Sequence, residues 1–218
     1  MTRTTMSPEV RRHYRLLPAA WISITLGLAD RFSWFLVRFK VSPNILTVLG
    51  LLSGAAVGLL YAAEHPGLAA AFIIVCGTFD ILDGRVAKNA DRKSLFGAIL
   101  DSSLDRYAEF FIYAGLAYHF RQGWGLWLMF SAFLGSTMVS YTRARAEGLG
   151  VDCQVGIMQR AERLVLLFLG TAAGIVFRVI NPAILTVMVF IAVISNFTAI
   201  QRIFYVKRYE KSRLSKEG

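Results

Sequence analysis

The chain has 218 residues, of which 56% are hydrophobic, and its mean hydropathy is +0.52. Such a composition is too apolar for an ordinary water-soluble domain. The net charge of +10 does not indicate a nucleic-acid-binding surface, because the basic residues lie between hydrophobic stretches rather than on one solvent-facing segment. We therefore expect an all-α integral membrane protein with no nucleic-acid partner.

The N-terminal segment mixes aromatic and charged residues. Within residues 18–40, Trp21 and Trp34 alternate with Asp30, Arg31 and other charges. This pattern is too polar to cross a bilayer but suits an amphipathic helix that lies in the membrane interface. We expect residues 1–40 to form a cytoplasmic and interfacial segment.

Six apolar stretches follow, each close to the roughly 20 residues that cross a hydrocarbon core. They lie near residues 45–63, 68–83, 95–119, 124–142, 162–180 and 183–204. Because the connectors are short, we expect one membrane domain over residues 1–218, with a six-helix bundle at 41–205 and a tail at 206–218.

Lysine and arginine residues collect on one side of these stretches. They precede the first stretch, separate the second from the third and the fourth from the fifth, and fill the tail. The connectors on the other side carry only Arg121 and Arg178. The positive-inside rule then places both termini and the basic loops in the cytoplasm, at the cell membrane.

Four aspartates stand near the cytoplasmic ends of the second and third stretches, and within each pair the spacing of three or four residues puts both on one helix face. They are Asp80, Asp83, Asp101 and Asp105. A charged side chain at mid-span costs about 2.5–3.5 kcal/mol, so the four require positive compensation. Carboxylates suit Mg²⁺ or Mn²⁺, and two such ions would balance them. Ion pairs with nearby arginines are the alternative, and for Glu109 a pair with Arg106 is preferred.

Small residues extend the acidic faces. Gly84 and Ala87 each lie four residues after an aspartate of the second stretch, and Gly97 lies four residues before the first aspartate of the third. A face without bulky side chains lets a large ligand approach the backbone. Beside metal-binding carboxylates, this indicates a pyrophosphate-containing substrate.

These residues together resemble the signature of the CDP-alcohol phosphotransferases, D-x2-D-G-x2-A-R-x8-G-x3-D-x3-D, with every spacing kept. The matching positions are Asp80, Asp83, Gly84, Ala87, Lys88, Gly97, Asp101 and Asp105. Lys88 departs from the usual arginine, which keeps the charge but loses the bidentate fork of a guanidinium group.

The resemblance implies transfer of a phosphatidyl-type group from a CDP-linked lipid, such as CDP-diacylglycerol, to a small polar alcohol. It implies that the first three aspartates ligate metal and that Asp105, beside the metal, is the general base. It also implies a homodimer.

The same resemblance implies where the CDP-lipid binds. The implied contacts are Asp80, Gly84, Ala87, Lys88 and Gly97, flanked by Asn44 and Thr47. For Asn44 and Thr47 a simpler interpretation stays open, in which they only form the first turn of a membrane helix that begins at Pro43.

Three arginines carry the prediction of the acceptor. Arg143, Arg160 and Arg202 lie in runs that resemble those of the phosphatidylinositol-phosphate synthase branch and its archaeal relatives. The resemblance implies that they hold the phosphate of inositol 1-phosphate. Alternatively, they only serve membrane topology, as basic cytoplasmic residues do.

Two further readings stay open. Glycerol 3-phosphate or serine could replace inositol phosphate as the acceptor of the same reaction. A divalent-cation transporter would also place acids in membrane helices, but it would place them near the middle of the membrane with openings to both sides.

Overall fold

The computed structural model describes residues 19–91 and 94–217, and within these ranges the chain forms seven helices and no strand. The helices are α2 (Ala19–Arg38), α3 (Pro43–Ala62), α4 (Pro66–Asn89), α5 (Leu95–His119), α6 (Gly125–Gly148), α7 (Arg160–Val176) and α8 (Ile180–Glu217). The all-α prediction is confirmed. Residues 1–18 of the predicted N-terminal segment lie outside the described residues.

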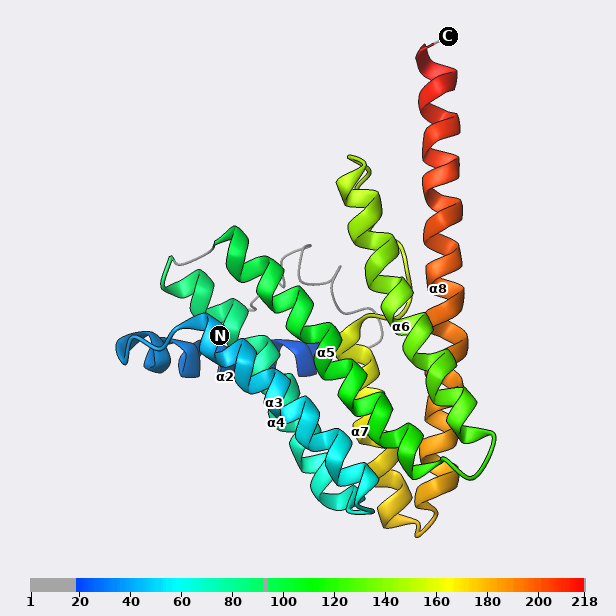
Figure 1. Cartoon of the computed structure of the whole chain (residues 1–218). Coiled ribbons are helices and arrows are strands. Elements are labelled where there is room, and N and C mark those ends of the chain that lie inside the picture. The colour runs from blue at the N-terminus through cyan, green and yellow to red at the C-terminus, as the bar shows by residue number, and fades with distance from the viewer. Residues whose placement is uncertain (1–18, 92–93, 218) are drawn as a thin grey trace.

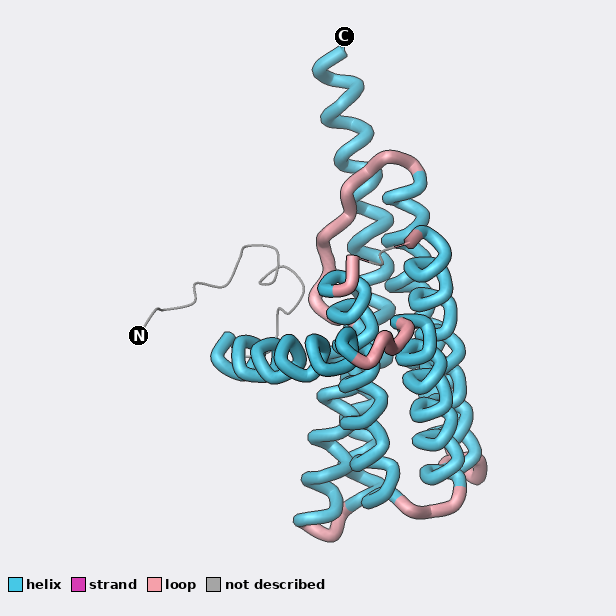
Figure 2. The backbone as a smooth tube through the Cα atoms, turned by 90° about the vertical axis from the view of Figure 1, so that its left-hand side faces the viewer, coloured by secondary structure: helices cyan, strands magenta, loops and turns pink. Residues whose placement is uncertain are grey.

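Helices α3 to α8 run alongside one another, and α2 lies across them near one end (Figure 2). The C-terminal part of α8 extends beyond the other helices at this end (Figure 1). The turns after α3, α5 and α7 gather at the opposite end. Chain direction therefore places the C-terminal end of α4 and the N-terminal end of α5 on the side of α2.

Three of the described helices are long and apolar enough to cross a membrane. They are α3, α4 and α8 as far as Ser215, whose most apolar segments have mean hydropathies of 2.1, 1.7 and 2.3. Helix α7 is shorter, with 17 residues. Helix α5 carries acidic and basic side chains in its first half. The chain thus has apolar helices of membrane-spanning length.

Several helices continue past the limits expected from hydropathy. Helix α4 runs on to Asn89, α6 to Gly148 and α8 to Glu217, so residues 206–217 of the predicted tail continue α8. Hydropathy falls where charged residues begin, but backbone hydrogen bonding does not stop there. Helix α7 instead ends early, at Val176, and Arg178 has a left-handed φ of 57° in the turn that follows.

Helices α3 and α5 approach each other at their backbones. A Cβ atom added to Gly115 would stand 1.9 Å from the carbonyl oxygen of Gly58, and one added to Gly58 would stand 2.1 Å from the carbonyl oxygen of Phe111. Small residues permit such close packing of membrane helices. The contact aligns α5, which carries two of the aspartates, along α3.

Helix α2 is attached to the C-terminal half of α4 by polar and apolar contacts. Asn89 Nδ2 donates to Ser33 Oγ at 2.7 Å, and Arg85 forms an ion pair with Asp30. Leu36 and Val37 pack against a small buried apolar cluster that includes Leu82. These contacts hold α2 across the bundle beside the aspartates of α4.

Candidate active site

The four aspartates meet where the C-terminal half of α4 faces the N-terminal half of α5. Asp83 is 5% exposed, and the other three are partly buried. Thr47 Oγ1 on α3 donates to Asp83 Oδ2 at 3.0 Å, and the backbone N–H of Gly84 donates to Asp83 Oδ1 at 2.5 Å. Asp83 and Asp101 lie close enough for their charges to interact. The structure therefore brings both acidic pairs together, as predicted from their helix faces.

Arg160, the first residue of α7, reaches into this cluster. Its Nε lies 3.1 Å from Asp80 Oδ2, and its Nη2 donates to Asp80 Oδ1 at 3.3 Å. Its Nη1 forms an ion pair with Asp105. The Arg160 side chain is 11% exposed. One guanidinium group thus joins an aspartate of α4 to an aspartate of α5.

A second set of ion pairs lies one helical turn deeper. Glu109 Oε1 accepts from Arg163 Nε at 2.9 Å and from Arg163 Nη2 at 2.5 Å, and both side chains are 3% exposed. Arg106 lies 3.5 Å from Glu109 and 3.5 Å from Asp105, and it also donates to Ser140 of α6. The predicted pair of Glu109 with Arg106 is present, but Arg163 makes the shorter contact.

Sequence reasoning missed the role of Arg163. A signal was available, because Arg163 follows Arg160 by three residues as Glu109 follows Asp105 by four. On two adjacent helices this spacing forms a ladder of ion pairs. The N-terminal turn of α7 is further fixed by Glu162, which accepts from the backbone N–H of Gln159 at 2.7 Å in a capping box.

The carboxylates around Arg160 are ligands of the kind that divalent cations prefer, although their side chains do not converge on one point. Among the described residues, no three His, Cys, Asp or Glu side chains converge where a metal ion could be held. Yet five carboxylates and three guanidinium groups make up the two sets of contacts, which leaves two negative charges uncompensated. The like charges of Asp83 and Asp101, which lie near each other, would also be stabilised by a cation.

The positions predicted to receive a CDP-lipid border the aspartates on one side. Gly84 and Lys88 are exposed on α4, and a Cβ added to Gly84 would meet no atom within 4 Å. Ala87 is half-buried on the same helix. A Cβ added to Gly97 would lie 3.5 Å from Asn44 Oδ1, so the start of α5 faces the start of α3. An open face with small residues thus adjoins the acids.

The three arginines predicted to hold the acceptor phosphate are not gathered together. Arg143 is 37% exposed and pairs with Glu147 on its own helix at 2.8 Å. Arg202 is 4% exposed and donates to the backbone carbonyl groups of Val139 and Val155. In this arrangement Arg202 attaches the segment after α6 to α8, and only Arg160 lies among the aspartates.

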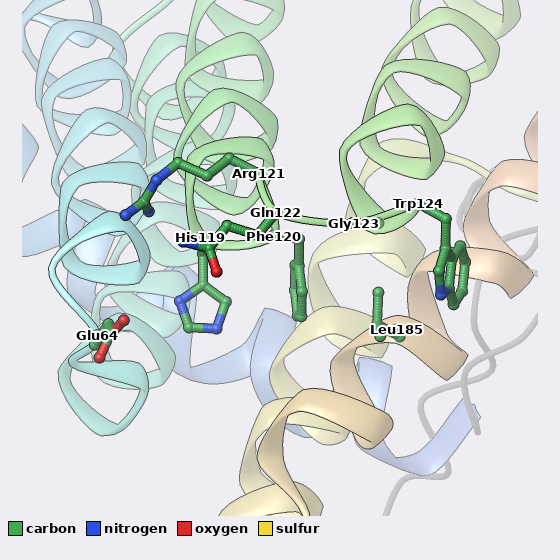
Figure 3. A pocket seen from close by; sticks show the side chains of 9 residues that line it. Glu64, His119, Phe120, Arg121, Gln122, Gly123, Trp124 and Leu185 are labelled. Atoms are coloured by element: carbon green, nitrogen blue, oxygen red, sulfur yellow. The ribbon is translucent and has the colours of Figure 1, made fainter.

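A cavity of about 310 Å³ lies at the other end of the bundle (Figure 3). Its walls are formed mainly by the turn between α5 and α6, with His119, Arg121 and Trp124, and by Glu64 and Leu185. None of the residues predicted to take part in the reaction lines this cavity.

The model of the CDP-alcohol phosphatidyltransferase family matches residues 40–197. The chain belongs to this family. It is therefore a transferase enzyme, and the resemblance seen in the aspartate signature is confirmed. The matched range begins just before α3 and ends within α8, so it includes all four aspartates, Arg143 and Arg160, whereas Arg202 lies beyond its end.

Relatives within the CDP-alcohol phosphatidyltransferase family extend the comparison. The chain is 37% identical to the archaetidylinositol phosphate synthase of Methanothermobacter thermautotrophicus over 171 residues, which cover 78% of this chain and 85% of the relative. It is 32% identical to the phosphatidylinositol phosphate synthase of Cutibacterium acnes over 164 residues, which cover 71% of this chain and 73% of the relative.

Solved structures of one family member have the same fold. The phosphatidylinositol phosphate synthase of Mycobacterium tuberculosis with CDP-DAG bound superposes with a TM-score of 0.73 at 28% identity, over 82% of this chain and 92% of that one. Its complex with manganese and citrate superposes with a TM-score of 0.72 at 27% identity, over 81% and 87% of the two chains.

Proposed function

We propose that this enzyme transfers a phosphatidyl group, or its ether-lipid equivalent, from a CDP-linked lipid to inositol 1-phosphate and releases CMP. The observation that carries the proposal is the meeting of Asp80, Asp83, Asp101 and Asp105 at one end of the bundle, with Arg160 among them. The activities for which the relatives are named support inositol phosphate as the acceptor, and the CDP-DAG bound to the M. tuberculosis enzyme supports a CDP-linked lipid as the donor.

The open face beside the acids suits the donor. Gly84, Ala87 and Gly97 leave room for the cytidine diphosphate group, and Lys88 offers one positive charge to its phosphates. Asn44 lies against Gly97, while Thr47 holds Asp83 by its hydroxyl. Thr47 therefore acts on the donor site by orienting a carboxylate.

The four aspartates would hold Mg²⁺ or Mn²⁺, with two ions for four carboxylates. When bound, such ions neutralise the negative charge that develops on a pyrophosphate. The uncompensated charge of the cluster and the manganese complex of the M. tuberculosis enzyme support this assignment.

Asp105 would act as the general base. The acceptor hydroxyl gives its proton to the Asp105 carboxylate, and the hydroxyl oxygen forms a bond to the lipid-side phosphorus. The phosphoanhydride bond breaks, and its electron pair leaves with CMP. Asp105 is suited to this role because it is partly buried at the edge of the cluster, beside Arg160, which would hold the acceptor phosphate.

Arg143 and Arg202 complete the proposed acceptor site on the side of α6 and α8. Arg143 would exchange its exposed partner Glu147 for the phosphate, since a pair of this kind contributes only about 0–1 kcal/mol. Arg202 already uses its Nε and one terminal nitrogen on backbone carbonyl groups, which leaves its other terminal nitrogen, Nη2, beside Gly156, for the ligand.

We further propose that α3 to α8 form six membrane spans within a single domain, that α2 lies in the interface, and that both termini and the aspartates face the cytoplasm. The mixed charges of α2, its course across the other helices (Figure 2) and the bias of basic residues toward alternate connectors support this orientation. The charged residues of α5 would then face the interior of the bundle. A homodimer is the expected assembly.

The test is CMP release by the purified enzyme with CDP-diacylglycerol and Mg²⁺. Inositol 1-phosphate, glycerol 3-phosphate, serine and free inositol are offered in parallel, beside an Asp105→Asn variant. Release with inositol 1-phosphate alone, lost in the variant, is the expected result. Release with another alcohol would overturn the acceptor, and no release with any of them would overturn the proposed reaction with this donor.

A further inference from the structure

Arg160 cannot hold an acceptor phosphate while it makes its present contacts. All three guanidinium nitrogens have a carboxylate oxygen nearby: Nη2 donates a hydrogen bond to Asp80, Nε forms an ion pair with Asp80, and Nη1 forms an ion pair with Asp105. The side chain is 11% exposed, so little of it is accessible to a ligand. The residue proposed to bind an anion is thus paired with the residues proposed to bind cations.

We propose that Arg160 is an internal counter-ion, which divalent metal displaces from Asp80 and Asp105 and thereby frees for the acceptor phosphate. Metal and acceptor would then bind cooperatively, with metal preparing the acceptor site. This inference rests on the proposed function, because it takes the aspartates as metal ligands and Arg160 as a phosphate ligand.

Charge balance gives the physical reason for the exchange. Partly buried carboxylates without a positive partner are costly, and a single guanidinium group bridging two of them reduces that cost. A divalent ion at the same carboxylates supplies more positive charge and repels the guanidinium group. An incoming phosphate offers Arg160 a new partner with a fork of oxygens that matches its own geometry.

The exchange requires a movement of the Arg160 side chain and not of α7. One turn further along the helix, Arg163 forms an ion pair with Glu109, and each of the two side chains is 3% exposed. The capping box of Gln159 and Glu162 fixes the backbone of the same turn. Because these contacts anchor the start of α7, we expect only the long side chain of Arg160 to change rotamer.

The experiment measures Mn²⁺ binding to purified protein by the electron paramagnetic resonance signal of the free ion, without donor or acceptor. Arg160→Gln removes the internal counter-ion, and Arg145→Gln is the matched control. Arg145 is exposed on α6, so the control removes the same charge without disturbing the cluster. We expect Arg160→Gln to bind Mn²⁺ on the order of tenfold more tightly than wild type, as typical couplings between sites allow.

Equal Mn²⁺ affinities in Arg160→Gln and Arg145→Gln would overturn the proposal, as would weaker binding in Arg160→Gln. If Arg160→Gln is not recovered in folded form, the Mn²⁺ affinity of Arg160→Lys is compared with that of Arg145→Gln instead. Lysine offers one ammonium group in place of a bridging fork, so its Mn²⁺ affinity should still exceed that of wild type.

A second titration follows inositol 1-phosphate by calorimetry, with inorganic phosphate as a further probe. Wild type should bind the probe more tightly with Mn²⁺ than without it, and Arg160→Gln should lose this dependence. Unchanged wild-type affinity for both probes would overturn the coupling. Tighter Mn²⁺ binding in Arg160→Gln together with no CMP release by the wild-type enzyme from inositol 1-phosphate would instead refute the proposed function and leave the counter-ion role standing.

Discussion

The two ends of the bundle hold their charged residues in different ways. Around the aspartates, buried ion pairs join separate helices, as with Glu109 and Arg163. At the other end, Arg121 donates to the carbonyl group of Tyr118, three residues away, and stacks over the ring of Tyr118 at 4.2 Å (Figure 3 shows Arg121). A buried ion pair between two helices fixes their relative positions, whereas a contact within one exposed turn affects only the conformation of that turn.

This difference indicates that the functional residues of the protein are concentrated around the aspartates. The buried charges there require partners, because each loses solvation and removal of a charge's main partner leaves it unpaired. Charges at the other end face solvent and can change without such a loss. Substitutions of buried charges near the aspartates should therefore change activity or stability strongly, and substitutions of exposed charges at the other end should change them little.

The largest effect is expected for Asp105→Asn. Loss of a general base lowers the rate of the chemical step by about 10²–10⁴-fold, so kcat should fall by this factor while the melting temperature in detergent stays close to that of wild type. Steady-state CMP release and thermal unfolding of the same preparations check this. A variant with more than a tenth of wild-type kcat would exclude Asp105 as the base.

Glu109→Gln should mainly lower stability. It leaves the buried Arg163 without its charged partner, which costs about 3–5 kcal/mol of unfolding free energy. Glu147→Gln is the matched control, because the Arg143–Glu147 pair has a similar distance of 2.8 Å but is 37% and 45% exposed. Denaturant unfolding in detergent should show a loss of less than about 1 kcal/mol for the control. Equal losses would contradict the role of burial.

Gly115→Ala tests the contact between α3 and α5, which involves no ion pair. The added Cβ would stand 1.9 Å from the backbone oxygen of Gly58, so α3 and α5 must separate, at a cost of about 1–3 kcal/mol. Gly67→Ala serves as control, because its Cβ would meet no atom within 4 Å. The same unfolding assay should show a loss for the first variant only, and an unchanged Gly115→Ala would argue against the close approach of these helices.

The smallest effect is expected for Arg121→Ala at the other end. Its contacts lie within one exposed turn, so the unfolding free energy should change by less than about 1 kcal/mol and CMP release should stay within about twofold of wild type. A strong loss of activity would show that the two ends are coupled.

Much of the site could be predicted from sequence because its elements are local. The spacing within Asp80–Asp83 and within Asp101–Asp105 sets each pair on one helix face, whatever the helix packs against. The helical class and the family also follow from sequence alone. The limits of α4, α6 and α8 could not be read from hydropathy, because it marks where a segment stops being apolar and not where backbone hydrogen bonds end.

By itself, then, the sequence determined the helices, their acidic faces and the chemistry that those faces can support. Only tertiary structure decided that Arg160 pairs with both Asp80 and Asp105, that Arg163 rather than Arg106 makes the closest contact with Glu109, and that Arg202 binds backbone carbonyl groups. The physical reason is that periodicity fixes neighbours along one helix. Partners across helices depend on how the backbones pack, and here that packing follows contacts such as those of Gly58 and Gly115.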